Sequence, residues 1–594
     1  MRQRFAALFL IALSIAACTS VVTSRDETTP SVTFNELLDQ YYEERLRLYP
    51  FEGTYAGDNR YNNQLHNDIT VAFRDTLRQF YAAYQDRLGS YDTAGFSEND
   101  KLSYEVLNWT CNVNLRRLGF NEHLTPLNQF WSLPLTMGVM ASGKSAQPFK
   151  TVEDYDNWFS RLEYYLAWTD TAIANMRKGM AQGYVIPKIL AERTIAQLEP
   201  FARGPVTEHL FYQPVLNFPE SFSEKERERL TIAYTDMVGL KIIPRYEKTV
   251  NFLKKEYYPA CRETSGISEI PNGTEYYDLM ITFYTTTQLS ADEIFNIGER
   301  EVARITTEME AVKEQVGFKG TLPEFFVHLR EKNELMPFTK PEEVIGNFNR
   351  IHEKMKPNLS KLFKRVPKTA FEVRRTEAFR EASASASYTG GSLDGTRPGI
   401  FYVPIPDVKK YNTLSDEDLF LHEAIPGHHY QISLQRENGD LPTFRKTSGY
   451  SAYSEGWALY TESLGKELGL YEDPYQYFGM LSAEMHRAIR LVVDVGIHSK
   501  GWTREQAIKY SLEHEAEDER SVTAEIERYM AIPGQALSYK IGQLKIRELR
   551  QKAEAALGAE FDVAEFHDQI LNSGNLPLSI LENKIDRWIA IQKR

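Results

Sequence analysis

The chain has 594 residues and a formal net charge of −13 at pH 7, with 42% hydrophobic and 25% charged residues. Nucleic-acid binding needs a basic stripe that neutralises phosphates, and this acidic sequence shows none, so we expect no nucleic-acid partner. The 34 tyrosines and 32 phenylalanines are typical of a large core. A chain of this length can form several domains or one large helical unit.

Residues 1–17 are expected to be a signal peptide. Arg2 and Arg4 make a short positive region, and the apolar run after them is too short to span a membrane as a mature helix. Two alanines precede Cys18, an arrangement that resembles the lipobox of bacterial lipoproteins. The resemblance implies a lipidated Cys18 that anchors the protein to the cell envelope facing the periplasm, and Thr19 favours the outer membrane. An ordinary secretory signal that contains a cysteine is the alternative.

The two other cysteines, Cys111 and Cys261, are isolated in the sequence. Export would permit a disulfide between them, and buried thiols are an equally good interpretation. So few cysteines exclude a cysteine-based zinc site and a disulfide scaffold.

A lipidated cysteine and a polar, threonine-rich tether occupy residues 18–33, and one unit is expected over residues 34–594. From Phe34 onward hydrophobic residues recur at intervals of three or four, which predicts helices. Ser290 and Glu293 have the spacing of a capped helix start. The other stretches with helical periodicity are 154–179, 223–257, 291–316 and 341–365.

One segment departs from this helical pattern. Residues 399–403 are rich in β-branched and aromatic side chains and follow a turn-rich stretch over 390–398, which predicts a strand. Ser415 is then expected to cap a helix with three acids, 416–418, in its first turn, where carboxylates interact well with the helix dipole. The predicted fold class is mainly α, with a small β element just ahead of this helix.

Three of the 12 histidines fall within eight residues: His422, His428 and His429, beside Glu423. In the common HExxH zinc motif, two histidines one helical turn apart share the metal and the glutamate acts as base. Here the second histidine comes six or seven residues after His422. On an unbroken helix His428 would point roughly 240° away and His429 would lie roughly 10 Å further along the axis. Neither would then share a metal with His422.

Pro426 and Gly427 are expected to break the helix between these histidines. Proline lacks an N–H and its ring opposes a preceding helical turn, while glycine tolerates unusual dihedral angles. A break at 425–427 would bring one histidine back to the metal. We favour His428, because a Gly-His pair also supplies the second ligand in several HExGH peptidases, although the spacing does not exclude His429. A surface helix with incidental histidines is the alternative interpretation.

A third metal ligand is expected from another helix. Glu455 lies at the start of the stretch 454–462, which we interpret as a helix start, and Glu462 is the alternative ligand. Three protein ligands leave a fourth position for water, as in catalytic zinc sites. Zinc lowers the pKa of that water, and Glu423 would accept its proton and pass it to the leaving amine.

The stretch 527–540 supplies candidates for the rest of the site. Tyr539 or Tyr529 would donate a hydrogen bond to the developing oxyanion, and Arg528 would hold a substrate carboxylate. Each tyrosine has a structural role as its alternative. A further polar group shares one face of a predicted helix and would either orient a ligand or form a buried ion pair: Arg490, Asp494 and His498.

Six stretches resemble, in order, motifs of the bacterial domain-of-unknown-function 885 family, and the likeness runs from about residue 31 to the C-terminus. All six lie between residues 390 and 545, where we place the metal-binding motifs. They are DGTRPGIFYV (394–403), HEAIPGHHYQ (422–431), EGWALYTE (455–462), RLVVDVGIH (490–498), GWTREQAI (501–508) and RYMAIPGQALSYKIG (528–542).

That family is itself similar to mainly helical zincin-like (gluzincin) metallopeptidases. The resemblance implies a zincin-like fold with a deep cleft, a small sheet whose edge strand at 399–403 pairs with an extended peptide, and Zn²⁺ held by His422, His428 and Glu455. It implies a zinc metallopeptidase of carboxypeptidase or oligopeptidase type that cleaves short peptides. The alternatives are hydrolysis of a non-peptide or cell-wall amide, and a non-catalytic lipoprotein that binds peptides or metal.

Overall fold

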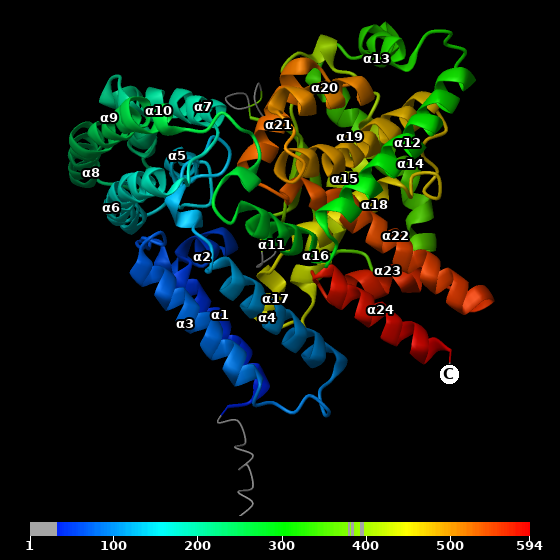
Figure 1. The fold of residues 1–594 in the computed structure, drawn as a ribbon, viewed down its shortest axis with the longest axis horizontal. Coiled ribbons are helices and arrows are strands. Elements are labelled where there is room, and N and C mark those ends of the chain that lie inside the picture. The colour runs from blue at the N-terminus through cyan, green and yellow to red at the C-terminus, as the bar shows by residue number, and fades with distance from the viewer. Residues whose placement is uncertain (1–31, 378–380, 382–384, 393–396, 594) are drawn as a thin grey trace, which may run out of the picture.

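A computed structural model of the protein describes residues 32–377, 381, 385–392 and 397–593. The predicted signal peptide, Cys18 and nearly all of the predicted tether lie outside the described residues. The fold is mainly α-helical with one small sheet (Figure 1), which confirms the predicted fold class at this level. None of the described helices combines the length and the apolar character that crossing a membrane requires.

The first ten helices form two groups, with α1–α4 together at the bottom of Figure 1 and α5–α10 together at its upper left. Two π-helical segments, 237–242 and 253–257, join α8, α9 and α10, which confirms the helical prediction over 223–257. The helices are α1 (Phe34–Leu48), α2 (Pro50–Ala56), α3 (Val71–Leu88), α4 (Glu98–Arg117), α5 (Leu133–Ala141), α6 (Val152–Gln182), α7 (Lys188–Leu198), α8 (Glu224–Asp236), α9 (Ile243–Phe252) and α10 (Tyr258–Ala260).

The remaining helices make up the larger part of the molecule. The capped start predicted at Ser290 is confirmed, since its backbone N–H donates to Glu293 Oε2 over 2.8 Å and its Oγ accepts from the Glu293 N–H over 3.3 Å. These helices are α11 (Gly273–Thr285), α12 (Ala291–Gln315), α13 (Leu322–Glu331), α14 (Pro341–Leu362), α15 (Asp416–Glu423), α16 (His428–Glu437), α17 (Thr443–Thr447), α18 (Ser451–Glu462), α19 (Pro474–His498), α20 (Arg504–His514), α21 (Glu519–Ala531), α22 (Ser538–Leu557), α23 (Val563–Leu571) and α24 (Leu578–Gln592).

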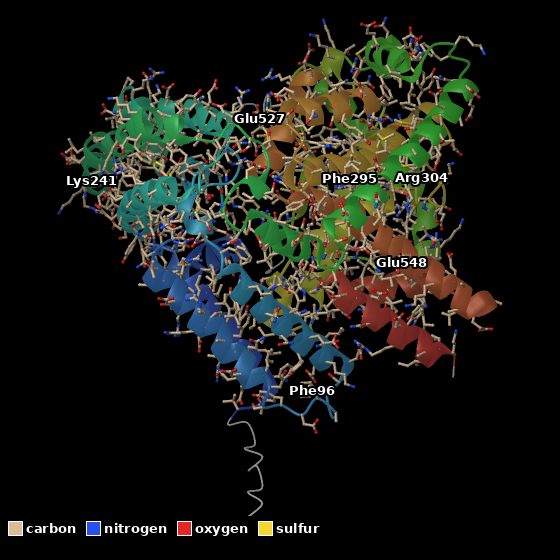
Figure 2. All side chains as sticks on the ribbon, viewed as in Figure 1. Phe96, Lys241, Phe295, Arg304, Glu527 and Glu548 are labelled. Carbon is tan, nitrogen blue, oxygen red and sulfur yellow. The ribbon has the colours of Figure 1, made fainter. Side chains whose placement is uncertain are left out.

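Most buried hydrophobic side chains of the described residues belong to two clusters. The larger cluster joins α1, α3 and α4 to α11 and the helices that follow it, and the smaller one lies chiefly within α5–α10. Glu527 on α21 links the two parts of the molecule (Figure 2), because its carboxylate binds Arg193 of α7 over 2.8 Å and Arg504 of α20 over 2.8 Å. With its side chain only 6% exposed, Glu527 is a buried bridge between two separately packed cores.

The sheet has three strands in the order β1-β3-β2: β1 (Phe371–Arg375), β2 (Ser387–Thr389) and β3 (Gly399–Val403). The predicted strand at 399–403 is therefore confirmed, but the expectation that it is an edge strand is wrong. It pairs in parallel with β1 and antiparallel with β2, so both of its backbone edges are already bonded. Its residues are almost all buried, as in a strand covered on both faces, whereas β1 carries the exposed charges expected of an edge.

Two glycines set the close approach of α18 and α22. A Cβ on Gly542 would collide with the carbonyl oxygen of Ala452, and a Cβ on Gly456 would lie 2.5 Å from the Gly542 Cα. At the start of α22, Ser538 Oγ hydrogen-bonds to Ser451 Oγ of α18 over 2.7 Å. Because neither glycine carries a side chain, the two backbones meet directly, and the first turns of both helices lie side by side.

Candidate metal centre

The helix that begins the histidine-rich stretch ends early. Helix α15 stops at Glu423, and α16 starts at His428 after a four-residue turn. The turn departs from helical geometry at both ends, with φ −106° and ψ −107° at Ala424 and φ −73° and ψ −124° at Gly427. The predicted break is confirmed. It places His422 and His428 on two different helices, α15 and α16.

Packing holds this turn in place. The Ile425–Pro426 peptide bond is cis, and the Trp457 Nε1–H of α18 donates to the Pro426 carbonyl oxygen over 2.9 Å. A Cβ on Gly427 would collide with the backbone oxygen of His422. Only glycine therefore fits where the turn folds back over the end of α15, and this return brings the start of α16 close to His422.

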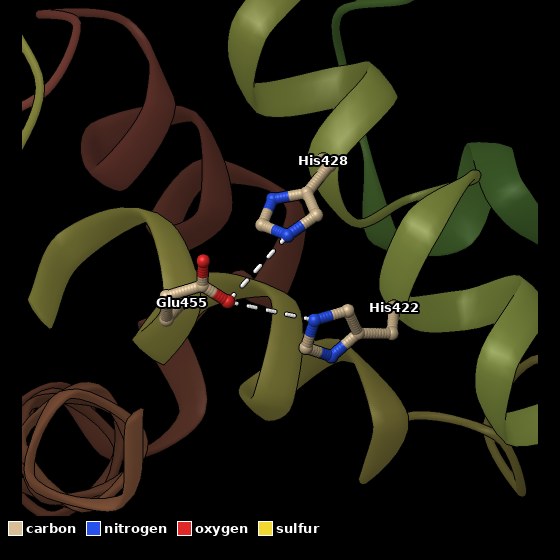
Figure 3. Close-up of side chains that lie close together, drawn as sticks. All are labelled: His422, His428 and Glu455. Carbon is tan, nitrogen blue, oxygen red and sulfur yellow. Dashed lines mark ion pairs between the residues drawn. The ribbon is translucent and has the colours of Figure 1, made fainter. Parts of the chain in front are cut away.

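The folded turn brings together His422, His428 and Glu455 (Figure 3). Glu455 Oε2 lies 3.6 Å from His422 Nε2 and 3.6 Å from His428 Nε2, and one nitrogen or oxygen from each residue lies within 4.8 Å of the others. Helix α18 begins at Ser451, earlier than the predicted start near 454, so Glu455 stands in its second turn. The side chains of His422, His428 and Glu455 are 6%, 12% and 24% exposed, so the group is mostly buried and Glu455 is its most exposed member.

His429 points away from this group. Its Nδ1 lies 2.9 Å from the Tyr388 hydroxyl and 3.4 Å from Ser433 Oγ, and its ring packs 5.0 Å from that of Phe371 on β1. Burial lowers the pKa of His429 to about 4, so the imidazole is neutral and acts as a core side chain beneath the sheet. The structure thus places His428, and not His429, beside His422 and Glu455.

Glu462, the alternative ligand in the sequence analysis, contacts the other nitrogen of His422 instead. Its Oε1 lies 2.7 Å from His422 Nδ1, which leaves Nε2 to face Glu455. Burial disfavours a charge on His422, but hydrogen bonds with Glu455 and Glu462 outweigh it and raise the pKa of His422 to about 10. The site is therefore electronegative and favours a positive charge between these groups.

The first turn of α15 differs from the prediction in how its acids are used. Ser415 makes no side-chain capping bond, and its backbone dihedral angles are not those of a usual cap. Asp416 is buried and accepts from the Tyr411 hydroxyl over 2.9 Å, while Glu417 accepts from the Tyr471 N–H over 2.6 Å. The three acids do lie in the first turn, as predicted, but tertiary hydrogen bonds hold Asp416 and Glu417, and the predicted side-chain cap from Ser415 does not form.

Glu423 occupies the last position of α15, directly after His422. Burial raises the pKa of its carboxyl group, and the adjacent His422 and His428 act in the opposite direction. The Glu423 carboxyl group is therefore close enough to both histidines to interact with them electrostatically. It is not a member of the group formed by His422, His428 and Glu455.

Of the two predicted tyrosines, Tyr539 is the one beside the triad, the name used from here on for His422, His428 and Glu455. Burial and the nearby Glu455 carboxylate raise the pKa of Tyr539, and its ring lies 4.5 Å from the guanidinium carbon of Arg490. The hydroxyl of Tyr529 is already used, since it accepts from Arg490 Nε over 3.0 Å and donates to Glu525 Oε2 over 2.7 Å. Tyr539 is therefore the better placed of the two to donate to a bound substrate.

Arg528, predicted to hold a substrate carboxylate, is occupied within the protein. It donates to both oxygens of Glu525, over 3.1 and 2.8 Å, and to Gln535 Oε1 over 2.6 Å. Sequence reasoning did not single out Glu525, although its positions three and four residues before Arg528 and Tyr529 on α21 place it on their face of the helix.

Two members of the predicted group on α19, Asp494 and His498, have structural roles. His498 Nε2 hydrogen-bonds to the Tyr529 carbonyl oxygen over 3.0 Å, and Asp494 accepts from the Gly534 N–H over 3.1 Å. These two residues hold the end of α21 and the turn that leads to α22, the helix that carries Tyr539 near its start. The two cysteines left open by the sequence, Cys111 and Cys261, are free and buried.

The comparisons with known proteins agree with this fold. The family described as "Bacterial protein of unknown function (DUF885)" matches residues 50–585. A protein of Colwellia psychrerythraea described as a lipoprotein is 30% identical, with a TM-score of 0.85 over 94% of this chain and 99% of that one. A protein of Shewanella oneidensis, described as a lipoprotein of unknown function, is 20% identical, with a TM-score of 0.74 over 93% and 99%. None of the curated proteins matches this sequence.

A protein of Bacillus anthracis described as an oligoendopeptidase F is 13% identical and covers 87% of this chain and 96% of its own length. Its TM-score is 0.27, which is too low to support an argument about fold or activity. The zincin-like fold and the deep cleft implied by the sequence resemblance therefore stay predictions.

Proposed function

The chain belongs to the family of bacterial proteins of unknown function called DUF885, and we propose that it is a zinc-dependent peptidase that hydrolyses short peptides. The observation that carries the proposal is the convergence of His422, His428 and Glu455 next to Glu423. Two imidazoles and one carboxylate form a donor set typical of catalytic zinc, which keeps a fourth position for water.

Two properties of these residues suit a zinc ion: the site favours positive charge, and a neighbouring carboxylate orients one of the histidines. The group is electronegative, and Glu462 hydrogen-bonds His422 Nδ1 so that Nε2 remains available as a ligand, the arrangement of the carboxylate–histidine pairs that orient metal ligands. His422 and His428 would each supply an imidazole nitrogen and Glu455 a carboxylate oxygen. When bound, zinc would polarise a water molecule and the scissile carbonyl group.

The protein's own residues would then carry the proton transfers of hydrolysis. Water adds across the amide, so that a hydroxyl group joins the carbonyl carbon, the C–N bond breaks and a proton goes to the amine nitrogen. Glu423 would accept the proton from the water and deliver it to that nitrogen, because its carboxyl group lies near both histidines and is not one of the three proposed zinc ligands. Tyr539 would donate a hydrogen bond to the oxygen that gains negative charge.

Attachment to the cell envelope through Cys18 is part of the proposal. The relatives from Colwellia psychrerythraea and Shewanella oneidensis are both described as lipoproteins, and the lipobox-like sequence before Cys18 supports the same anchor here. The outer membrane stays a prediction. Labelling with a radioactive fatty acid and fractionation of the two membranes would test both, with Cys18→Ala as the unlabelled control.

Zinc content and peptide cleavage together test the proposed activity. We expect the purified protein to hold about one zinc ion per chain, to cleave members of a short-peptide library, and to lose cleavage when a chelator removes the metal. Activity should return when zinc is added back. A protein that purifies without zinc and cannot take it up would rule out the metal site. Zinc-dependent cleavage of non-peptide or cell-wall amides alone would favour the other substrate class.

Glu462 is expected to tune the affinity for zinc. Replacement of Glu462 by glutamine removes the negative charge that orients and polarises His422, and it should weaken zinc binding by about 10- to 100-fold. Zinc competition with a chelator of known affinity measures the change. Glu467→Gln is a matched control, since Glu467 is 39% exposed and pairs with Arg550 outside the site. Equal zinc affinity in the wild type and Glu462→Gln would mean that Glu462 does not support the ligand.

A further inference from the structure

Arginine and aromatic side chains alternate in a series next to the metal centre. The guanidinium carbon of Arg528 lies 5.5 Å from the ring centre of Phe130 and 4.9 Å from that of Tyr529. The guanidinium carbon of Arg490 lies 5.8 Å from the ring centre of Tyr529 and 4.5 Å from that of Tyr539. Aromatic faces stabilise a guanidinium cation without using its N–H groups, so such stacking leaves those groups free for other partners.

The series runs from the surface to the triad. Phe130, at its outer end, is 48% exposed. Tyr539, at its inner end, adjoins Glu455 because the first turns of α18 and α22 lie side by side, joined by the hydrogen bond between Ser451 and Ser538. Arg490 therefore contacts the tyrosine that borders the metal ligand Glu455.

Positive charge exceeds negative charge along this series. Glu525 Oε2 pairs with Arg490 Nη2 over 3.1 Å and with Arg528 Nη2 over 2.8 Å, and no other ion pair involves either arginine in the described part of the chain. His486 lies beside the same carboxylate, with its Nε2 3.7 Å from Glu525 Oε2, and its Nδ1 pairs with Glu515 over 2.5 Å. Two guanidinium groups thus share a single carboxylate, and a second anion would find favourable electrostatics here.

Arg490 also has a nitrogen without a partner. Its Nε donates to the Tyr529 hydroxyl and its Nη2 to Glu525, whereas Nη1 is buried and has no hydrogen-bond partner among the described residues. The side chain is 9% exposed. Arg528 differs, because Glu525 and Gln535 occupy Nε, Nη1 and Nη2. A buried N–H group that lacks an acceptor costs free energy, and a bound anion would remove that cost.

We propose that Arg490 binds the C-terminal carboxylate of the peptide substrate, which makes the protein a peptidase that acts at the C-terminal end. The proposal rests on the proposed function and names its substrate class: peptides with a free C-terminal carboxylate. A guanidinium group recognises a carboxylate through directional, charge-assisted hydrogen bonds. Bound one side chain away from Glu455, the carboxylate would set the distance between the chain end and the scissile bond.

Paired peptides test this inference on the wild-type protein. Two peptides of the same sequence, one ending in a carboxylate and the other in a carboxamide, differ only in the group that Arg490 would bind. We expect kcat/KM to be about 100-fold higher for the carboxylate peptide, mainly because its KM is lower. Equal kcat/KM for the two peptides would overturn the inference and leave the proposed peptidase intact. Cleavage of neither peptide, in a protein that lacks zinc, would overturn both.

Substitutions assign the effect to Arg490. Arg490→Gln should lower kcat/KM for the carboxylate peptide about 100-fold and abolish the preference, whereas Arg490→Lys should keep part of it. Arg193→Gln is the matched control, because Arg193 pairs with Glu527 on α21 but lies outside the series, and it should keep the full preference. Circular dichroism checks that each variant is folded. A folded Arg490→Gln protein that keeps the full preference would contradict the assignment.

Discussion

Replacement of Glu423 by glutamine is expected to lower kcat by about two to four orders of magnitude while the zinc content stays at the wild-type level. Glutamine has nearly the same shape as glutamate but cannot accept a proton, so the water would lose its base. Because Glu423 is not one of the three residues that would hold zinc, the metal should remain bound. Steady-state kinetics on a cleaved peptide and elemental analysis of the same preparation measure the two effects.

The control for this substitution is an acid of the same type outside the site. Glu472 is 76% exposed and pairs with Lys354, so Glu472→Gln should retain wild-type kcat. Retained turnover in Glu423→Gln would remove its role as the base. Loss of zinc together with turnover would instead show that Glu423 supports the metal site.

The variants His428→Ala and His429→Ala are expected to differ strongly in their affinity for zinc. We expect His428→Ala to weaken zinc binding by more than about 100-fold and to abolish cleavage, because losing a ligand should cost more than losing a group that orients one. His429→Ala should keep zinc affinity within a few-fold of the wild type. It should lower the free energy of unfolding by about 1–3 kcal/mol, since the neutral ring is buried and bonded to Tyr388.

Zinc titration and thermal unfolding of both variants measure these effects. The two histidines are adjacent in the sequence and chemically identical, so each variant is the control for the other. Zinc loss in His429→Ala with retention in His428→Ala would reverse the assignment of the second ligand. Equal zinc loss in both would show that the turn itself, rather than one imidazole, had been disrupted.

Features that depend on neighbouring residues were predictable from the sequence. The start of α12 was predictable because each of Ser290 and Glu293 accepts, through its side chain, a hydrogen bond from the backbone N–H of the other within one turn. The break between α15 and α16 was predictable because Pro426 and Gly427 act on the local backbone whatever surrounds them. Residues 399–403 form the predicted strand for a similar reason, since their side chains favour extended structure.

Features that depend on distant segments were not predictable. Whether 399–403 is an edge or a central strand depends on β1 and β2, and no property of the strand alone reveals two partners. Ser415 has the residue type of a cap, but its side chain makes no capping bond, and Tyr411 and Tyr471 bond the acids of this turn instead. Arg528 has the chemistry of a carboxylate binder, but Glu525 and Gln535 already occupy it.

The sequence by itself predicted a mainly helical chain and a metal site at His422, Glu455 and one of two adjacent histidines, with Glu423 as the base. These features were predictable because residue types and a helix break are local properties of the chain. Only the tertiary structure separated His428 from His429: Tyr388 and Phe371 of the sheet enclose His429, and the turn over Gly427 directs His428 towards His422 and Glu455. Side-chain direction after a break depends on packing against segments far away in the chain, and spacing alone does not contain that information.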